Sequence, residues 1–127
     1  MRVLALRGAI TLDDDSAAEV ETRTVQLLET LYERNGLTHD DVISVFFTAT
    51  SDVTAAPPGV GARAFGLVDV PLLCAQEQEV DGSLRRCVRL MMHVHLDRPR
   101  PDLRHVFLRG AIVLRPELAE PGDGDLQ

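Results

Sequence analysis

Arginines within apolar segments are the residues of this sequence with the clearest potential for chemistry. Arg7, Arg89 and Arg115 each lie within or at the end of a mostly apolar stretch, where an unpaired cation is costly. Each therefore needs an anionic partner. One interpretation is a structural ion pair with an acidic residue such as Glu77. The other is a dicarboxylate ligand, which guanidinium groups bind through paired hydrogen bonds, and the residue types alone leave the two nearly even.

Cysteine and histidine side chains offer two further chemistries. Cys74 follows an apolar segment and His105 lies far along the chain, so a Cys–His nucleophile stays open. A buried cysteine behaves as a small hydrophobic residue, and this interpretation is favoured for Cys74 and especially for Cys87. His93 and His95 would share one face of a strand, but the absence of a third ligand at a characteristic spacing disfavours a metal site.

Composition and motifs exclude several function classes. The sequence contains no GxGxxG, GxxxxGK[ST], HExxH or GxSxG motif, which argues against the common nucleotide-binding and hydrolase sites. A net charge of −7 argues against nucleic-acid binding. The first residues, MRVLALRGAI, fit neither a signal peptide nor a membrane span. We predict a cytoplasmic protein with free thiols that binds no membrane.

Hydrophobic patterning predicts the elements that must position these side chains. A cap at Asp15 or Ser16 begins a helix that Gly36 closes, and Pro57 starts a second, short helix that ends at Gly66. Apolar and β-branched segments predict five strands, over residues 1–11, 42–50, 68–74, 86–96 and 105–114.

The order of these elements predicts an α+β fold close to the α/β class, with a mixed β-sheet and the helices on one of its faces. Two helices are too few to cover every apolar strand face. The remaining apolar surface indicates self-association, for which closed symmetric rings are the usual form. We expect a single domain over residues 1–115 and, because residues 116–127 are acidic and rich in Pro and Gly, a mobile C-terminal tail.

Three segments together resemble a known family. They are LRGAI around Arg7, VPLLCAQEQEVDGSLRRCVRLMM at residues 70–92, and RHVFLRGAIVLRPEL at residues 104–118. These segments resemble the monofunctional AroH-class chorismate mutases, and the resemblance extends from Arg2 to about Leu118. The combination of RGA, CxxE, CxRxMM and LRP[DE]L is far more specific than any one of its parts.

The resemblance implies an enzyme that converts chorismate to prephenate by a 3,3-sigmatropic Claisen rearrangement, at the branch toward phenylalanine and tyrosine. It also implies a homotrimer built around a pseudo-α/β-barrel, with active sites in the clefts between subunits. The family uses no metal, cofactor or covalent intermediate, so the expected partners are chorismate and two further copies of the chain.

The same resemblance implies roles for individual residues. Arg89 would donate to the ether oxygen of the breaking bond, Arg7 would bind the enolpyruvyl carboxylate, and Glu77 would hold the ring hydroxyl together with the backbone at Cys74. The further substrate-binding positions that it implies are Arg63, Phe107, Leu114, Arg115, Cys87, Leu73 and Pro57.

The sequence departs from the family pattern at four of its positions. Phe107 stands where the family usually has a tyrosine, Pro57 replaces an aromatic residue, Val60 a lysine, and Leu73 a threonine. Losing one hydrogen bond costs roughly 0.5 to 1.5 kcal/mol, or up to about 3 kcal/mol when the partner is charged, which affects substrate affinity more than reaction type. The alternatives are a non-catalytic trimer that binds a small anion, and an enamine/imine deaminase of similar fold.

Overall fold

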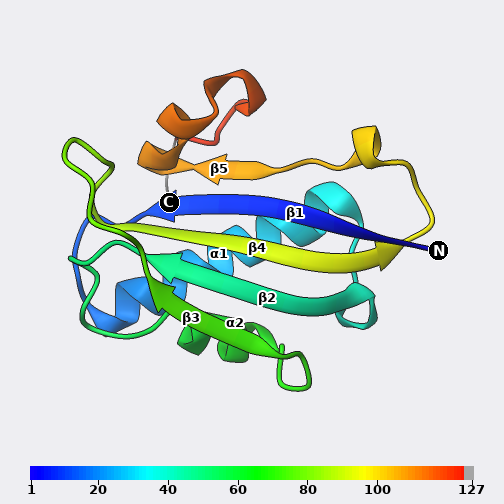
Figure 1. Ribbon diagram of the computed structural model, residues 1–127, viewed down its shortest axis with the longest axis horizontal. Helices are drawn as coiled ribbons and strands as arrows, with labels where there is room; N and C mark the ends of the chain where they lie inside the picture. The colour runs from blue at the N-terminus through cyan, green and yellow to red at the C-terminus, as the bar shows by residue number, and fades with distance from the viewer. Residues whose placement is uncertain (125–127) are drawn as a thin grey trace.

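The computed structural model describes residues 1–124 as a mixed five-stranded sheet (Figure 1). Its strands lie in the order β3-β2-β4-β1-β5. The central strand β4 is antiparallel to both β1 and β2, whereas β5 is parallel to β1 and β3 is parallel to β2. The strand bounds are β1 Arg2–Thr11, β2 Val42–Ala49, β3 Leu72–Gln76, β4 Cys87–Leu96 and β5 Val106–Leu108. The prediction of a mixed sheet is confirmed.

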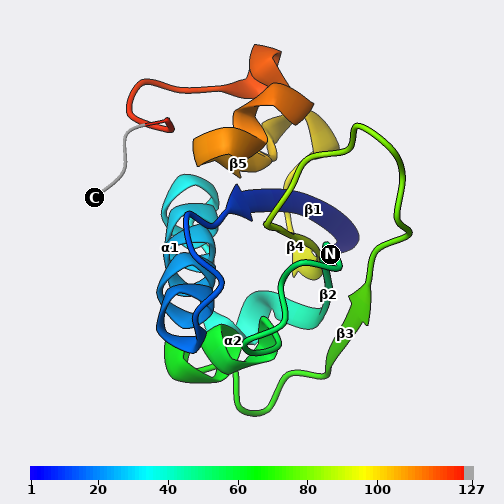
Figure 2. The ribbon, with the colours of Figure 1, turned by 90° about the vertical axis from the view of Figure 1, so that its left-hand side faces the viewer.

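Two α-helices, α1 (Ala17–Asn35) and α2 (Gly59–Phe65), lie on one face of the sheet, as Figure 2 shows. The hydroxyl of Ser16 accepts a hydrogen bond from the Glu19 backbone and caps α1. Gly36 ends this helix in a left-handed conformation, with φ of 61°. The predicted caps and the predicted placement of the helices on one face are therefore confirmed.

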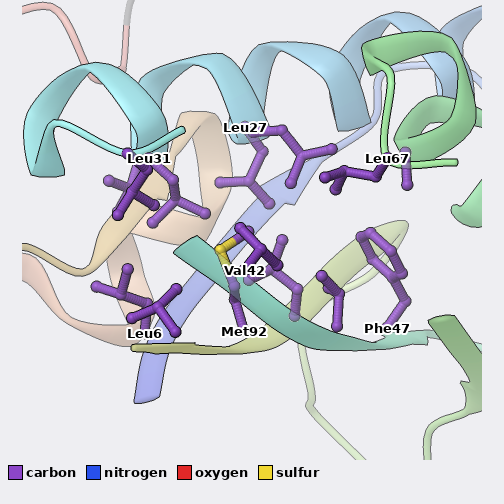
Figure 3. Packing of buried hydrophobic residues seen from close by; sticks show 14 of the residues in the cluster. Leu6, Leu27, Leu31, Val42, Phe47, Leu67 and Met92 are labelled. Carbon is purple, nitrogen blue, oxygen red and sulfur yellow. The ribbon is translucent and has the colours of Figure 1, made fainter. Parts of the chain in front are cut away.

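The hydrophobic core fills the space between the helices and the sheet (Figure 3). Leu27 and Leu31 of α1 pack over Leu6, Phe47 and Met92 of the sheet, and all five side chains are fully buried. Because strand side chains alternate between faces, the residues between the core positions point away from the helices. Exposed apolar side chains of that outer face are Val3, Phe46, Leu73 and Met91.

The predicted long strand over residues 105–114 is wrong, because the strand stops at Leu108. Arg109 adopts a left-handed conformation with φ of 57°, and residues 109–114 continue as a 3-10 helix. Gly110 lies so close to Thr11 that a Cβ atom would come within 2.9 Å of the threonine hydroxyl. Tertiary contacts thus override the β-branched composition of this segment.

The third strand also differs from the prediction, since pairing starts at Leu72 rather than at residue 68. Pro71 has no N–H group and contributes only its carbonyl, which accepts a hydrogen bond from Val45. At the other end, the Glu77 backbone N–H donates to Ala49 at 2.8 Å and continues the pairing with β2 by one residue. This register fixes the backbone of Glu77 at the edge of the sheet.

The C-terminal segment folds back along α1. Residues 116–118 form a 3-10 turn, and Asp123, which is 2% exposed, pairs with Arg34 of α1. The Asp123 carbonyl also accepts a hydrogen bond from the Arg109 backbone at 2.8 Å. Residues 125–127 of the predicted tail lie outside the described residues, and the domain boundary at Arg115 stays a prediction.

Candidate active site

Arg7 and Arg89 come together on the outer face of the sheet. Arg7 lies on β1 and Arg89 on the adjacent strand β4, where its Cα partner is Ala9. The Nε–H of Arg7 donates to the Leu90 carbonyl at 3.2 Å, which fixes the guanidinium over β4. A cavity of about 330 Å³ opens beside these two arginines. Its lining residues are Arg7, Phe46, Thr48, Arg89, Leu90 and Met91.

Glu77 is held beside Arg89 by two contacts to the same carboxylate oxygen. Arg89 Nε lies 3.0 Å from Glu77 Oε2, and the Thr48 hydroxyl donates to that oxygen at 2.8 Å. Among the described residues, the Arg89 Nε–H makes no hydrogen bond of favourable angle, so its contact with Glu77 is an ion pair. The two guanidinium groups outnumber the one carboxylate, so these three groups have a net positive charge. Together with the apolar walls, they suit a small anionic ligand.

A histidine that directly precedes β5 supports the backbone of Arg7. The Arg7 N–H donates to His105 Nδ1 at 3.0 Å, which requires an unprotonated Nδ1. Burial, followed by the positive charges of Arg115 and Arg7, lowers the pKa of His105 below its ordinary value of 6.5. Arg115 itself pairs with Glu117 at 2.7 Å. His105 is therefore neutral at physiological pH, and its protonation would break the contact with Arg7.

We expect the free energy of unfolding to fall as the pH drops below about 6.5, because the unfolded chain then binds a proton at His105 before the folded chain does. The loss ends once the pH is below the lowered folded-state pKa. Urea unfolding at pH 7.5 and pH 5 measures it. A His105→Asn variant keeps a hydrogen-bond acceptor near the Nδ1 position and should lose less stability over this interval. An equal loss in both proteins would contradict the assignment.

Three of the predicted site residues line a different cavity. Pro57, Arg63 and Cys74 border a space of about 490 Å³ beside α2. Cys74 points toward the helix, since its sulfur would lie 3.5 Å from a Cβ atom at Gly59. Within one chain, these residues are therefore not brought together with the two outer-face arginines.

The remaining predicted residues lie in other environments. Cys87 and Phe107 are buried in a small cluster with Ala9 and Ala111, against whose edge Leu114 packs. Leu73 is 59% exposed on the outer face, where its Cα partner is Phe46. Neither Cys87 nor Phe107 lines one of the cavities described above.

The two cysteines have different surroundings. Cys87 is a buried free thiol, and burial raises its pKa to about 11, so the interpretation as a small hydrophobic residue is confirmed for it. Cys74 is exposed, and for this residue the favoured buried interpretation is wrong. No hydrogen bond joins Cys74 to His105 in the described part of the chain.

The alternation of His93 and His95 does not produce a metal site. His93 packs edge-on against Phe46, and His95 Nε2 lies 2.8 Å from the Asp40 carbonyl oxygen. No three metal-ligating side chains gather anywhere in residues 1–124. Over the same residues, no helix is both long and apolar enough to cross a membrane.

Comparison with known proteins decides between the remaining interpretations. The family model for chorismate mutase type I matches residues 3–118, which is most of the chain. The chain belongs to this family. The resemblance drawn from the sequence is thereby confirmed: the protein is a chorismate mutase, an isomerase, and the deaminase and anion-binding alternatives are not favoured.

Individual relatives of this chorismate mutase agree with the family match. The chain is 39% identical over 120 residues to chorismate mutase AroH of Bacillus subtilis (strain 168), covering 94% of both chains. It is 41% identical over 117 residues to chorismate mutase AroH of Thermus thermophilus, covering 91% of this chain and 96% of that one. The solved chorismate mutase from Clostridium thermocellum superimposes with a TM-score of 0.84 at 46% identity, covering 86% of this chain and 97% of the other.

Thr48, which contacts Glu77, is not among the site residues that the sequence predicts. In the sequence, Thr48 fits an apolar, β-branched strand without standing out, because threonine is common in strands. The signal that could have found it is the alternation in β2, which places Thr48 on the same face as Phe46. Its hydroxyl reaches Glu77, and that contact depends on the pairing of β3 with β2 and is therefore not visible in the sequence pattern alone.

Proposed function

We propose that this chorismate mutase converts chorismate to prephenate at the cavity beside Arg7, Glu77 and Arg89. The observation that carries the proposal is the meeting of these three side chains from β1, β4 and the end of β3 on one face of the sheet. Chorismate carries two carboxylates and a ring hydroxyl. Two guanidinium groups and one carboxylate are chemically complementary to them.

Arg89 supplies the charge that matters most to the reaction. In the Claisen rearrangement the ether C–O bond breaks while a C–C bond forms, and the ether oxygen gains partial negative charge in the transition state. A guanidinium already oriented by the Glu77 ion pair at 3.0 Å stabilises that charge without reorganising. The step is intramolecular and transfers no proton, so it needs no cofactor, metal or nucleophile.

The other two groups orient the substrate. Arg7, fixed over β4 by its bond to the Leu90 carbonyl, binds the enolpyruvyl carboxylate, and Glu77 accepts from the ring hydroxyl. The apolar walls at Phe46 and Met91 confine the substrate to the chair conformation in which the reacting carbons meet.

A homotrimer with active sites between subunits completes the site. The proposal is supported by the exposed apolar strip at Phe46, Leu73 and Met91 and by the two separate cavities of one chain. An adjacent subunit would bring Arg63 and the Cys74 backbone of its own second cavity to face the Arg89 cavity. Closed rings of this kind arise when a heterologous contact repeats around an axis.

The remaining proposed substrate contacts come from Arg115 and from a neighbouring apolar cluster. Arg115 is half exposed and pairs with the exposed Glu117 among the described residues, so a substrate carboxylate can compete for it. Leu114, Cys87 and Phe107 form a cluster with Ala9 and Ala111 that backs the site without lining its cavity in one chain, and by the family pattern they would complete its apolar wall. Phe107 offers no hydroxyl where the family has a tyrosine. We propose a cytoplasmic location, in keeping with the two free thiols.

Loss of chorismate, followed by its ultraviolet absorbance with prephenate identified as the product, tests the proposed function. Light scattering on the same sample should give three times the chain mass. A folded trimer that binds chorismate without turning it over would contradict the proposal in favour of the anion-binding alternative, and ammonia release from an imino acid would favour the deaminase.

A further inference from the structure

The Thr48 hydroxyl lies at the centre of the proposed site, although the reaction chemistry gives it no direct part. We propose that Thr48 is a positioning residue that holds the Glu77 carboxylate in its working orientation. This inference rests on the proposed role of Glu77. It concerns how that carboxylate is kept apart from the terminal nitrogens of Arg89.

Three neighbouring strands bring the groups together. Thr48 of β2 is the Cα partner of Arg89 on β4, and Glu77 follows the last residue of β3 on the other side of β2. The Glu77 backbone is fixed by its hydrogen bond to Ala49, so only the side-chain torsions of Glu77 remain to be set. The bond of 2.8 Å from Thr48 sets them.

Both contacts of the carboxylate go to a single oxygen. Thr48 donates to Glu77 Oε2, and Arg89 Nε lies 3.0 Å from the same atom. No group among residues 1–124 hydrogen-bonds to Glu77 Oε1, and the Glu77 side chain is 16% exposed to solvent. The second oxygen is therefore available to accept a hydrogen bond from a ligand hydroxyl.

The same arrangement keeps the donors of Arg89 available. A carboxylate beside a guanidinium prefers to pair with two of its N–H groups at once. Thr48 instead holds Oε2 at the Nε position of Arg89, 3.0 Å away, and this arrangement leaves the terminal nitrogens of Arg89 for other partners. Without the hydroxyl, Glu77 is free to rotate and to occupy the donors that the substrate needs.

The test compares Thr48→Val with Thr48→Ser in chorismate turnover. Valine keeps the size and β-branching of threonine, so the strand is retained, whereas serine keeps the hydroxyl. Because the lost bond ends on a charged group, we expect Thr48→Val to lower kcat/KM about 10- to 100-fold, mainly through kcat. Thr48→Ser should stay close to the unmodified enzyme. Thr30→Val, at a half-buried position of α1 outside the proposed site, is the matched control and should leave turnover unchanged.

A double-mutant cycle with Glu77→Ala identifies the route of the effect. If Thr48 acts through Glu77, adding Thr48→Val to Glu77→Ala causes no further loss. An equal additional loss, or an unimpaired Thr48→Val single variant, would overturn the inference while leaving the proposed function intact. Full activity of Glu77→Ala would instead remove the proposed role of Glu77 itself, so the two failures are distinguishable.

Discussion

Alanine in place of Arg89 is expected to lower kcat several hundred-fold or more. Removing one preorganised donor from the charge that develops in a transition state typically costs about 3 to 4 kcal/mol. Of the two outer-face arginines, Arg89 is the one in contact with Glu77. Steady-state turnover of chorismate by identically prepared proteins measures the effect.

The control for this variant is Arg100→Ala, which removes an exposed arginine of the 3-10 turn at residues 100–102 and should leave kcat unchanged. Arg89→Lys should also be severely impaired, since an ammonium group cannot present the planar fork of a guanidinium. Near-normal turnover by a folded Arg89→Ala trimer would end the assignment of Arg89 as the key cation.

Mixing two impaired variants should restore activity if each active site is shared between subunits. Arg89→Ala damages the outer-face cavity, and Arg63→Ala damages the cavity beside α2. In every hybrid trimer, one of the three sites combines an intact half from each chain, so random assembly from equal amounts of the two variants gives about a quarter of all sites when the unmixed trimers are counted as well. Coexpression with two different affinity tags isolates the hybrids for the turnover assay.

The matched control for complementation is the pair Arg89→Ala and Arg7→Ala. Both residues belong to the same cavity, so every site in these hybrids carries a lesion and activity should stay low. Equal recovery in the two mixtures, or none in either once hybrid trimers are isolated, would contradict a site built from two subunits.

Much of the fold follows from local patterns. The helix over residues 17–35 has a Ser16 cap, an apolar stripe and a closing Gly36, and all three signals act within a few residues of one another. The turn at Arg109 has no such local signal. It depends on the approach of Gly110 to Thr11, nearly a hundred residues earlier in the chain, and therefore the pattern predicted a strand there.

The residues of the candidate site can be predicted from the sequence about as well as the fold, but their grouping cannot. Arg7 and Arg89 stand out because a cation in an apolar strand is unusual, and the family resemblance adds Glu77. The grouping of these residues depends instead on the strand order. Only the pairing of β3 with β2 places Glu77 beside Thr48. Only the folded chain shows that Arg63 and Arg89 line separate cavities.

The early end of β5 also bears on how the folded chain avoids aggregation. An edge strand exposes unpaired backbone groups onto which another molecule can add a strand, and short edges with abrupt turns limit that addition. At this edge only residues 106–108 run as a strand before Arg109 turns the backbone away. The left-handed conformation of Arg109 thus keeps this edge short, which limits edge-to-edge pairing between the sheets of two molecules.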